Sequence, residues 1–308
     1  MSATTTTPSA APPKPTPASV IAGNSLWSDS FKRLRKNRMA VICSIFMIFM
    51  MLACFVGPWL AYHLAGLDPK IQDTANMAAP PSWQHWLGTD TLGRDMLVRV
   101  LDGGRIALSI GFVATFIAII IGVTWGATAG YVGGKVDMVM MRIVDVLYGF
   151  PTLAFVIVLQ ATFGAKGTFV LFAVIGAISW LNMARIVRAQ VLSLRHREFV
   201  EAARSLGANN ERILFLHIVP NVLGVVIIYA TLSMPHIMLT EAFLSYIGLG
   251  VQAPASSWGT LVTEGSAYVL AYPWLLIGPG VAMSSTIFAL NFLGDGLRDA
   301  LDPKSLKA

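Results

Sequence analysis

Charged residues are scarce in this sequence of 308 residues. Asp, Glu, Lys and Arg together make up 12% of the chain, whereas an average soluble domain is about one quarter charged. Hydrophobic residues make up 55%. A soluble globule of this size needs more charge on its surface, so the composition excludes an ordinary cytosolic enzyme, a disordered protein and a fibrous protein. It indicates an all-α membrane protein with several spans.

Residues that carry out chemistry are equally few. Cys43 and Cys54 lie eleven positions apart in one apolar run, about 16 Å along a helix, which is too far for a disulfide. The five histidines form no HExxH or similar metal-binding spacing. No serine and histidine are spaced as a nucleophile and its base. The sequence therefore predicts no catalytic residue, no metal and no cofactor.

A phosphate-binding loop of the GxxxxGK[ST] type is also missing, so the chain cannot itself hold ATP. The net charge of +6 agrees with a nucleic-acid partner only in sign. With so few charges, we expect no nucleic acid and instead a gathering of basic residues on one side of a lipid bilayer.

The sequence contains several long apolar runs. Each is near the roughly 20 residues that a bilayer core of ~30 Å requires. Six spans are predicted, at residues 39–60, 105–130, 138–163, 168–188, 221–246 and 271–293. Pro151 is expected to kink the third span, and Pro235 is expected to bend the fifth.

The distribution of basic residues predicts the orientation of these spans. With six spans, 17 of the Lys and Arg residues fall on the side of the termini and 5 on the opposite side. The positive-inside rule then places both termini and the loop after the fourth span in the cytoplasm. Residues 1–26, rich in Thr, Ala, Ser and Pro, are predicted to form a disordered cytoplasmic tail.

The rest of the chain divides at the predicted spans. Residues 27–104 hold the first span, interpreted as an uncleaved helix, and an extracytoplasmic loop. Residues 105–295 form the main membrane domain, with a cytoplasmic loop at 195–220, and residues 296–308 form a cytoplasmic C-terminal tail. In the second span, Gly122, Gly126 and Gly130 follow a GxxxGxxxG pattern, which predicts close packing against another helix.

The cytoplasmic loop has helical periodicity. Phe199, Ala202, Ala203 and Leu206 stand at positions i, i+3, i+4 and i+7 of a short amphipathic helix, and Gly207 can end it in the left-handed conformation. Asn209 or Asn210 can cap a second short helix. Two interpretations are open: a knob that projects from the membrane, or a helix on the lipid headgroups held by arginines. Periodicity alone favours the second.

The identity of the residues in this loop instead favours the knob that projects from the membrane. Glu201-Ala202-Ala203, followed by Gly207 and Pro220, resembles the EAA loop of binding-protein-dependent ABC importer permeases. The pattern departs at its end, where His217 replaces an Ile and Val219 a Leu. Four further stretches, at 87–99, 133–142, 180–188 and 291–304, resemble the peptide/nickel branch of this family, above all its oligopeptide permease C subunits.

This resemblance implies a six-helix type I ABC importer permease that takes up oligopeptides or dipeptides across a bacterial inner membrane. It implies that Glu201, Ala202, Ala203 and Gly207 belong to a coupling helix that docks on an ATPase. The implied partners are a homologous permease, two ATP-binding subunits, an extracytoplasmic peptide-binding protein and membrane lipid. Import of nickel or glutathione by the same architecture is one alternative, and an ion-coupled secondary transporter or an intramembrane hydrolase are others.

Two polar residues in the fifth span are candidates for the substrate path. Glu241 is an acid in a span, which suggests function, but it lies about 30 Å from the start of that span and so near the outer interface. A structural or interfacial role is favoured there. His236 lies deeper, and bonding to a neighbouring helix is its alternative. Around Asp90 and Arg94, a structural role is favoured over contact with a binding protein.

Overall fold

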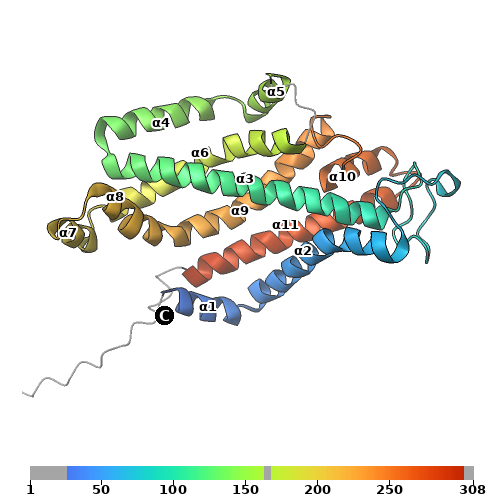
Figure 1. Ribbon diagram of the computed structural model, residues 1–308, viewed down its shortest axis with the longest axis horizontal. Helices are drawn as coiled ribbons and strands as arrows, with labels where there is room; N and C mark the ends of the chain where they lie inside the picture. Colours follow the sequence, from blue (N-terminus) through green and yellow to red (C-terminus); the bar gives the residue numbers. More distant parts are fainter. Residues whose placement is uncertain (1–25, 163–167, 302–308) are drawn as a thin grey trace, which may run out of the picture.

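The computed structural model describes residues 26–162 and 168–301, and in this part of the chain the regular elements are helices. Five of them are long, and Figure 1 shows these lying side by side along one direction. The long helices are α2 (Arg38–Ala65), α3 (Met96–Val132), α6 (Thr168–Leu194), α9 (Val219–Tyr246) and α11 (Trp274–Leu301). The short elements are α1 (Leu26–Lys36), η1 (Thr74–Asn76), α4 (Gly134–Gly149), α5 (Thr152–Thr162), α7 (Glu198–Ser205), α8 (Asn210–Arg212), the π-helix η2 (Ile213–Ile218) and α10 (Trp258–Ala267).

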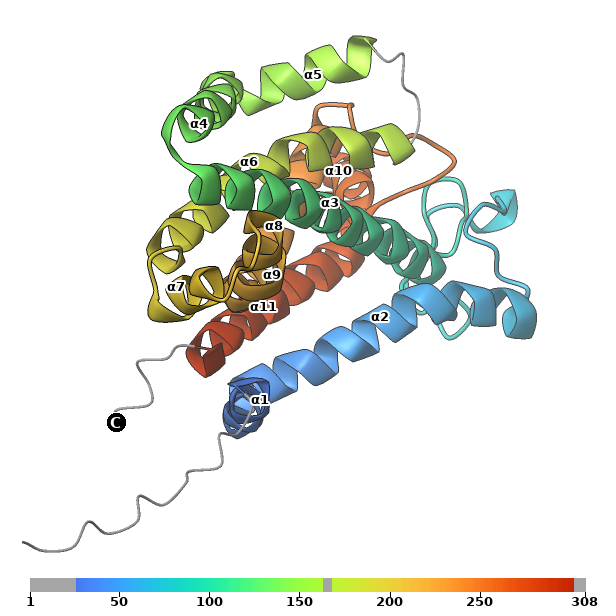
Figure 2. The ribbon, with the colours of Figure 1, turned by 60° about the vertical axis from the view of Figure 1, so that its left-hand side comes forward.

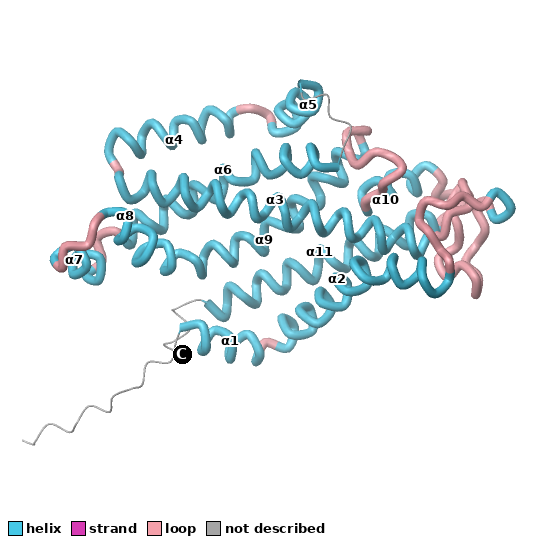
Figure 3. The backbone as a smooth tube through the Cα atoms, viewed as in Figure 1, coloured by secondary structure: helices cyan, strands magenta, loops and turns pink. Residues whose placement is uncertain are grey.

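The two ends of the bundle differ. Helices α1, α7 and α8 and the end of α11 gather at one end, and α10 lies toward the other with the loop that joins α2 to α3 (Figure 1). The tube drawing in Figure 3 shows most of the loop structure at this second end. Figure 2 shows α2 on one flank of the bundle and α4 and α5 on the opposite flank.

Four helical runs of the described residues are long and apolar enough to cross a membrane: α2, α3, α11 and the continuous run Asn210–Tyr246, which contains α8, η2 and α9. They correspond to the first, second, sixth and fifth predicted spans. The fourth predicted span coincides with α6, a helix of 27 residues. Six membrane crossings therefore stay a prediction.

The third predicted span, 138–163, is two helices rather than one kinked helix. Helix α4 ends at Gly149, Phe150 is extended with φ −77° and ψ 137°, and α5 begins at Thr152. The cause is Pro151, which has no N–H to donate and forces the residue before it out of the helical conformation.

Other boundaries also differ from the sequence-based expectation. Helix α3 begins at Met96, nine residues before the predicted start of its span, because the Asp95 side chain caps it by accepting the N–H of Val98 at 3.0 Å. Thr89 and Asp90, which as Thr and Asp could also serve as N-caps, lie in the preceding loop. Residues 296–301 of the predicted C-terminal tail continue α11. The predicted N-terminal tail lies almost wholly outside the described residues.

Helices α3 and α6 pack with almost no side chain between them. The three glycines of the GxxxGxxxG pattern face α6: a Cβ at Gly122 would lie 2.6 Å from Cβ of Met183, and one at Gly130 would lie 2.9 Å from the carbonyl oxygen of Arg188. A Cβ at Gly126 would overlap the carbonyl oxygen of Ala184. This seam fixes the C-terminal half of α3 to the C-terminal half of α6.

The loop before α3 is held by a buried ion cluster. Asp90 is 3% exposed and accepts hydrogen bonds from Nε of Arg94 at 2.6 Å and from a guanidinium nitrogen of Arg99 at 2.7 Å. Arg99, also 3% exposed, donates in addition to Glu264 of α10 at 3.1 Å. These charges have structural partners, as the favoured interpretation expected, and they tie the loop to α10.

Candidate functional site

The loop at residues 195–220, predicted to be cytoplasmic and called here the coupling segment, has one face packed on the bundle and one face open. Val200 and Ala203 of α7 are buried in an apolar cluster with Val187 and Val191 of α6. Phe199 is 40% exposed, Leu206 is 88% exposed, and Ala202 is exposed. The predicted apolar face is therefore divided, because Ala203 turns inward with Val200 while the other three residues face outward.

A tight turn follows α7 at Gly207. This residue has φ +83°, the left-handed conformation that was expected there, and a Cβ would meet no heavy atom within 4 Å. Glycine is thus required by backbone conformation and not by lack of space. Asn209 then caps α8, accepting the N–H of Arg212 at 2.9 Å, so the first of the two candidate caps is the one used.

Two polar contacts fix the coupling segment to the end of α3. A guanidinium nitrogen of Arg195 donates to the carbonyl oxygen of Gly130 at 3.2 Å, and the Tyr131 hydroxyl lies 3.0 Å from Oδ1 of Asn210. The outward residues Glu201, Ala202 and Leu206 are therefore presented from a surface anchored on both sides. Sequence reasoning missed both contacts, because each joins residues at least 65 positions apart.

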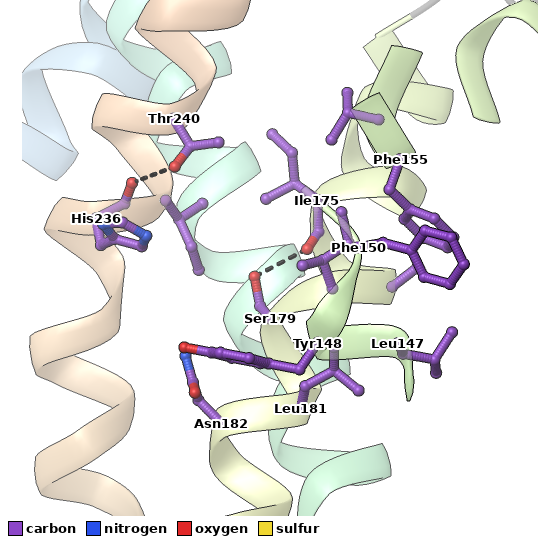
Figure 4. A pocket seen from close by; sticks show the side chains of 14 residues that line it. Leu147, Tyr148, Phe150, Phe155, Ile175, Ser179, Leu181, Asn182, His236 and Thr240 are labelled. Carbon is purple, nitrogen blue, oxygen red and sulfur yellow. Dashed lines mark hydrogen bonds between the residues drawn. The ribbon is translucent and has the colours of Figure 1, made fainter. Parts of the chain in front are cut away.

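A cavity of about 230 Å³ lies between the α4–α5 junction, α6 and α9. Figure 4 shows His236 and Thr240 of α9 on one wall, and Tyr148 reaching toward Asn182 of α6 on the other. Both walls are mainly apolar, as small-molecule sites are. The polar groups that line the cavity come from Tyr148, Ser179, Asn182, His236 and Thr240.

The two path candidates occupy different environments. His236 is exposed and lines this cavity. Glu241 does not line it: the side chain is 2% exposed and accepts hydrogen bonds from Ser245 at 2.8 Å and from Ser257 at 2.6 Å. Since Ser257 is the N-cap of α10, Glu241 joins α9 to α10. These contacts agree with the structural role favoured for Glu241, while its depth in the membrane stays a prediction.

Four polar residues of α9 share one side of the helix, and two of them, His236 and Thr240, line the cavity. Tyr229, Ser233, His236 and Thr240 follow one another at spacings of four, three and four residues, which places them on one side of α9. None of the four is buried. A run of polar residues on one face of an otherwise apolar helix indicates a face that does not meet lipid.

Helix α4 is attached to α6 by two ion pairs. Arg188 donates twice to Asp137, at 2.5 and 2.6 Å. Arg185 donates once to Asp145, at 2.8 Å, and its guanidinium carbon lies 4.2 Å from the centre of the Tyr148 ring. The second pair therefore borders the cavity that Tyr148 lines.

Comparison with known proteins adds the family. Residues 118–307 match the model described as "Binding-protein-dependent transport system inner membrane component", and residues 25–81 match the N-terminal TM domain of oligopeptide transport permease C. The chain is 48% identical to the oligopeptide transport system permease protein OppC of Haemophilus influenzae, covering 92% of this chain and 90% of that protein. It is 47% identical to OppC of Escherichia coli, covering 92% of this chain and 93% of the relative.

A solved structure shares the fold. The MetNI methionine ABC transporter, in an inward-facing conformation, aligns with a TM-score of 0.55 over 67% of this chain and 96% of the matched chain. The sequence identity is 19%, so this likeness concerns the fold alone.

Proposed function

The chain belongs to the family of binding-protein-dependent transport system inner membrane components, and from this premise we propose that it imports oligopeptides. The chain is a membrane permease subunit of an ABC importer and not an enzyme. Peptides are the proposed substrate because the relatives that it matches over 92% of its length are named oligopeptide permeases. Nickel and glutathione have no such support.

One observation carries the mechanism: the coupling segment presents Phe199, Ala202 and Leu206 outward while Val200 and Ala203 hold it to the bundle. An apolar outer face that the chain itself leaves uncovered suits a partner subunit. We assign this partner as an ATPase, with Glu201 beside the apolar contacts and Gly207 setting the angle of the turn. Two such ATPases, a homologous permease and an extracytoplasmic peptide-binding protein complete the proposed importer.

In this mechanism the chain transmits motion and provides half of the substrate path. Closure of the ATPases on ATP would draw the two coupling segments of the permease pair together. Since α3 and α6 share the glycine seam, they would move as one body and switch the cavity between inward and outward access. His236 belongs to the proposed path, whereas Glu241 has a structural role.

The proposed orientation places both termini and the coupling segment in the cytoplasm of a bacterium, and six helices in its inner membrane. The gathering of α1, α7, α8 and the end of α11 at one end of the bundle supports this arrangement (Figure 1).

Reconstitution tests the proposal. The chain, its partner permease and the ATPases are placed in vesicles with the binding protein outside, and uptake of a labelled peptide is measured with and without ATP. ATP-dependent uptake is expected. Uptake driven by an ion gradient without ATP, or uptake of nickel but of no peptide, would contradict the proposal.

A further inference from the structure

The ion pair between Arg185 and Asp145 lies within helices that the proposed function places in the membrane. Asp145 is eight residues beyond Asp137 at the start of α4, a rise of about 12 Å. Yet the two side chains are 36% and 55% exposed. Charged groups at such a depth face a water-filled space or another protein surface and not lipid. The exposed side of this pair therefore faces either the transport path or the partner permease, and the cavity next to it favours the path.

The position of the guanidinium is fixed beside the cavity. It lies 4.2 Å from the centre of the Tyr148 ring, a cation–π distance, and Tyr148 lines the cavity. Asn182, which also lines it, is one helical turn from Arg185 on α6, so the two side chains lie on the same side of the helix. An amide thus lines the cavity, and a cation lies next to Tyr148 at its border.

Arg185 has donors to spare. A guanidinium carries five N–H donors, and in the structure a single hydrogen bond joins this one to Asp145. The neighbouring pair is different, because Arg188 donates twice to Asp137 and that carboxylate is only 14% exposed. Arg188 is thus occupied in joining helices, whereas Arg185, among the described residues, is held in place with part of its hydrogen-bonding capacity unused.

We propose that Arg185, positioned by Asp145 and Tyr148, binds the carboxylate of a peptide that occupies the cavity. The planar guanidinium matches a carboxylate with two parallel hydrogen bonds, and Asn182 adds an amide donor. Asp145 keeps the guanidinium in place in the empty cavity and competes with the substrate for it. The proposal rests on the proposed peptide uptake and names the part of the substrate that this chain recognises.

Two sources can supply the carboxylate, the C-terminus of a peptide or an acidic side chain. Three versions of one peptide separate them: the free acid, the C-terminal amide, and the amide with a glutamate in its sequence. Uptake of each is measured in vesicles that contain the complete importer. Dividing the uptake ratio of a variant by that of the wild type removes the preference of the binding protein, which is the same in both.

For Arg185→Gln, uptake of the free acid relative to the amide is expected to fall about tenfold, because the glutamine amide can keep one of the two hydrogen bonds to the carboxylate and loses the other. Asp145→Asn is expected to raise the same ratio, because it removes the competing carboxylate. Arg185→Lys keeps the charge and should recover part of the preference. If the glutamate peptide responds in place of the free acid, an acidic side chain is the group that is bound.

Arg188→Gln is the matched control, since it removes the neighbouring ion pair of the same two helices. It is expected to lower uptake of all peptides alike. Unchanged ratios in both Arg185→Gln and Asp145→Asn, with peptide uptake retained, would overturn this inference alone. If Arg185→Gln fails to assemble, Asp145→Asn decides. A higher uptake of the free acid relative to the amide supports the inference, and an unchanged or lower ratio contradicts it. No peptide uptake by the wild-type importer would contradict the proposed function instead.

Discussion

Two single residues have roles that depend on their residue type, one through backbone conformation and one through buried hydrogen bonds. Gly207 supplies a positive φ in open surroundings, and Glu241 accepts two serine hydroxyls on one buried oxygen. The first requirement could be predicted from sequence, because a glycine after a short amphipathic segment is a local signal. The second could not, because Ser257 is 16 residues from Glu241 and meets it only through the return of α10.

Gly207→Val is expected to reduce peptide uptake about tenfold, because a β-branched residue is strained by roughly 1–2 kcal/mol in the left-handed conformation and would turn α8 away from its place. Gly207→Asn is the control, since Asn adopts this conformation more readily. Uptake and co-purification of the ATPases are measured together. Equal, wild-type values for both variants would contradict the role of this turn in coupling.

Glu241→Ala is expected to lower the free energy of unfolding by about 1–3 kcal/mol, because the hydroxyls of Ser245 and Ser257 lose their buried acceptor. Glu241→Gln keeps an oxygen at the accepting position and should cost less. Thermal unfolding in detergent gives the stability, and uptake at varied peptide concentration gives the apparent affinity. A changed affinity with unchanged stability would restore Glu241 to the substrate path.

At the level of elements, the seam between α3 and α6 depends on the absence of side chains. The GxxxGxxxG spacing made close packing predictable, but it could not identify α6 as the partner, because any helix with a smooth face satisfies the pattern. The presence of a distortion between α4 and α5 could be predicted from sequence, but a complete break could not. Pro151 pointed to a distortion, while its extent depended on Phe150 taking an extended conformation.

Gly126→Ala is expected to destabilise the chain by about 1–3 kcal/mol through overpacking, since the new Cβ would overlap backbone of α6. Gly280→Ala in α11 is a matched control, because a Cβ there meets no heavy atom within 4 Å. Thermal unfolding of both variants in detergent is compared with the wild type. Equal melting temperatures would show that the seam is looser than described.

At the scale of the whole molecule, the long helices α2, α3, α6, α9 and α11 could be predicted from apolar runs. The point at which a helix begins could not always be predicted in this way. The start of α3 follows from Asp95 and from a charge cluster that includes Glu264, which is 165 residues from Arg99. Interactions of this kind have no periodicity to reveal them. The polar face of α9 does have a periodicity, four polar residues at helical spacing, and two of these residues line the cavity.

Orientation is open to a direct test. Trp83→Cys, at a position 96% exposed in the loop between α2 and α3, should react with a membrane-impermeant thiol reagent from outside intact cells. Ser193→Cys, exposed at the end of α6, should react only after the membrane is opened. The native Cys43 and Cys54 are buried and give a low background. The reverse labelling pattern would contradict both the orientation and the coupling segment.

The break at Phe150 and Pro151 also governs the hydration of the transport path. A helix that ends leaves carbonyl oxygens of its last turn without intrahelical partners, and here that turn borders the cavity that Leu147 and Tyr148 line. Hydrocarbon cannot satisfy such oxygens, and irregular backbone at this depth is tolerated only against protein or water. If the proposed peptide path runs through this cavity, ordered water would satisfy these oxygens whenever no peptide is present. Each arriving peptide would then exchange its own hydration shell for the backbone acceptors that this water releases.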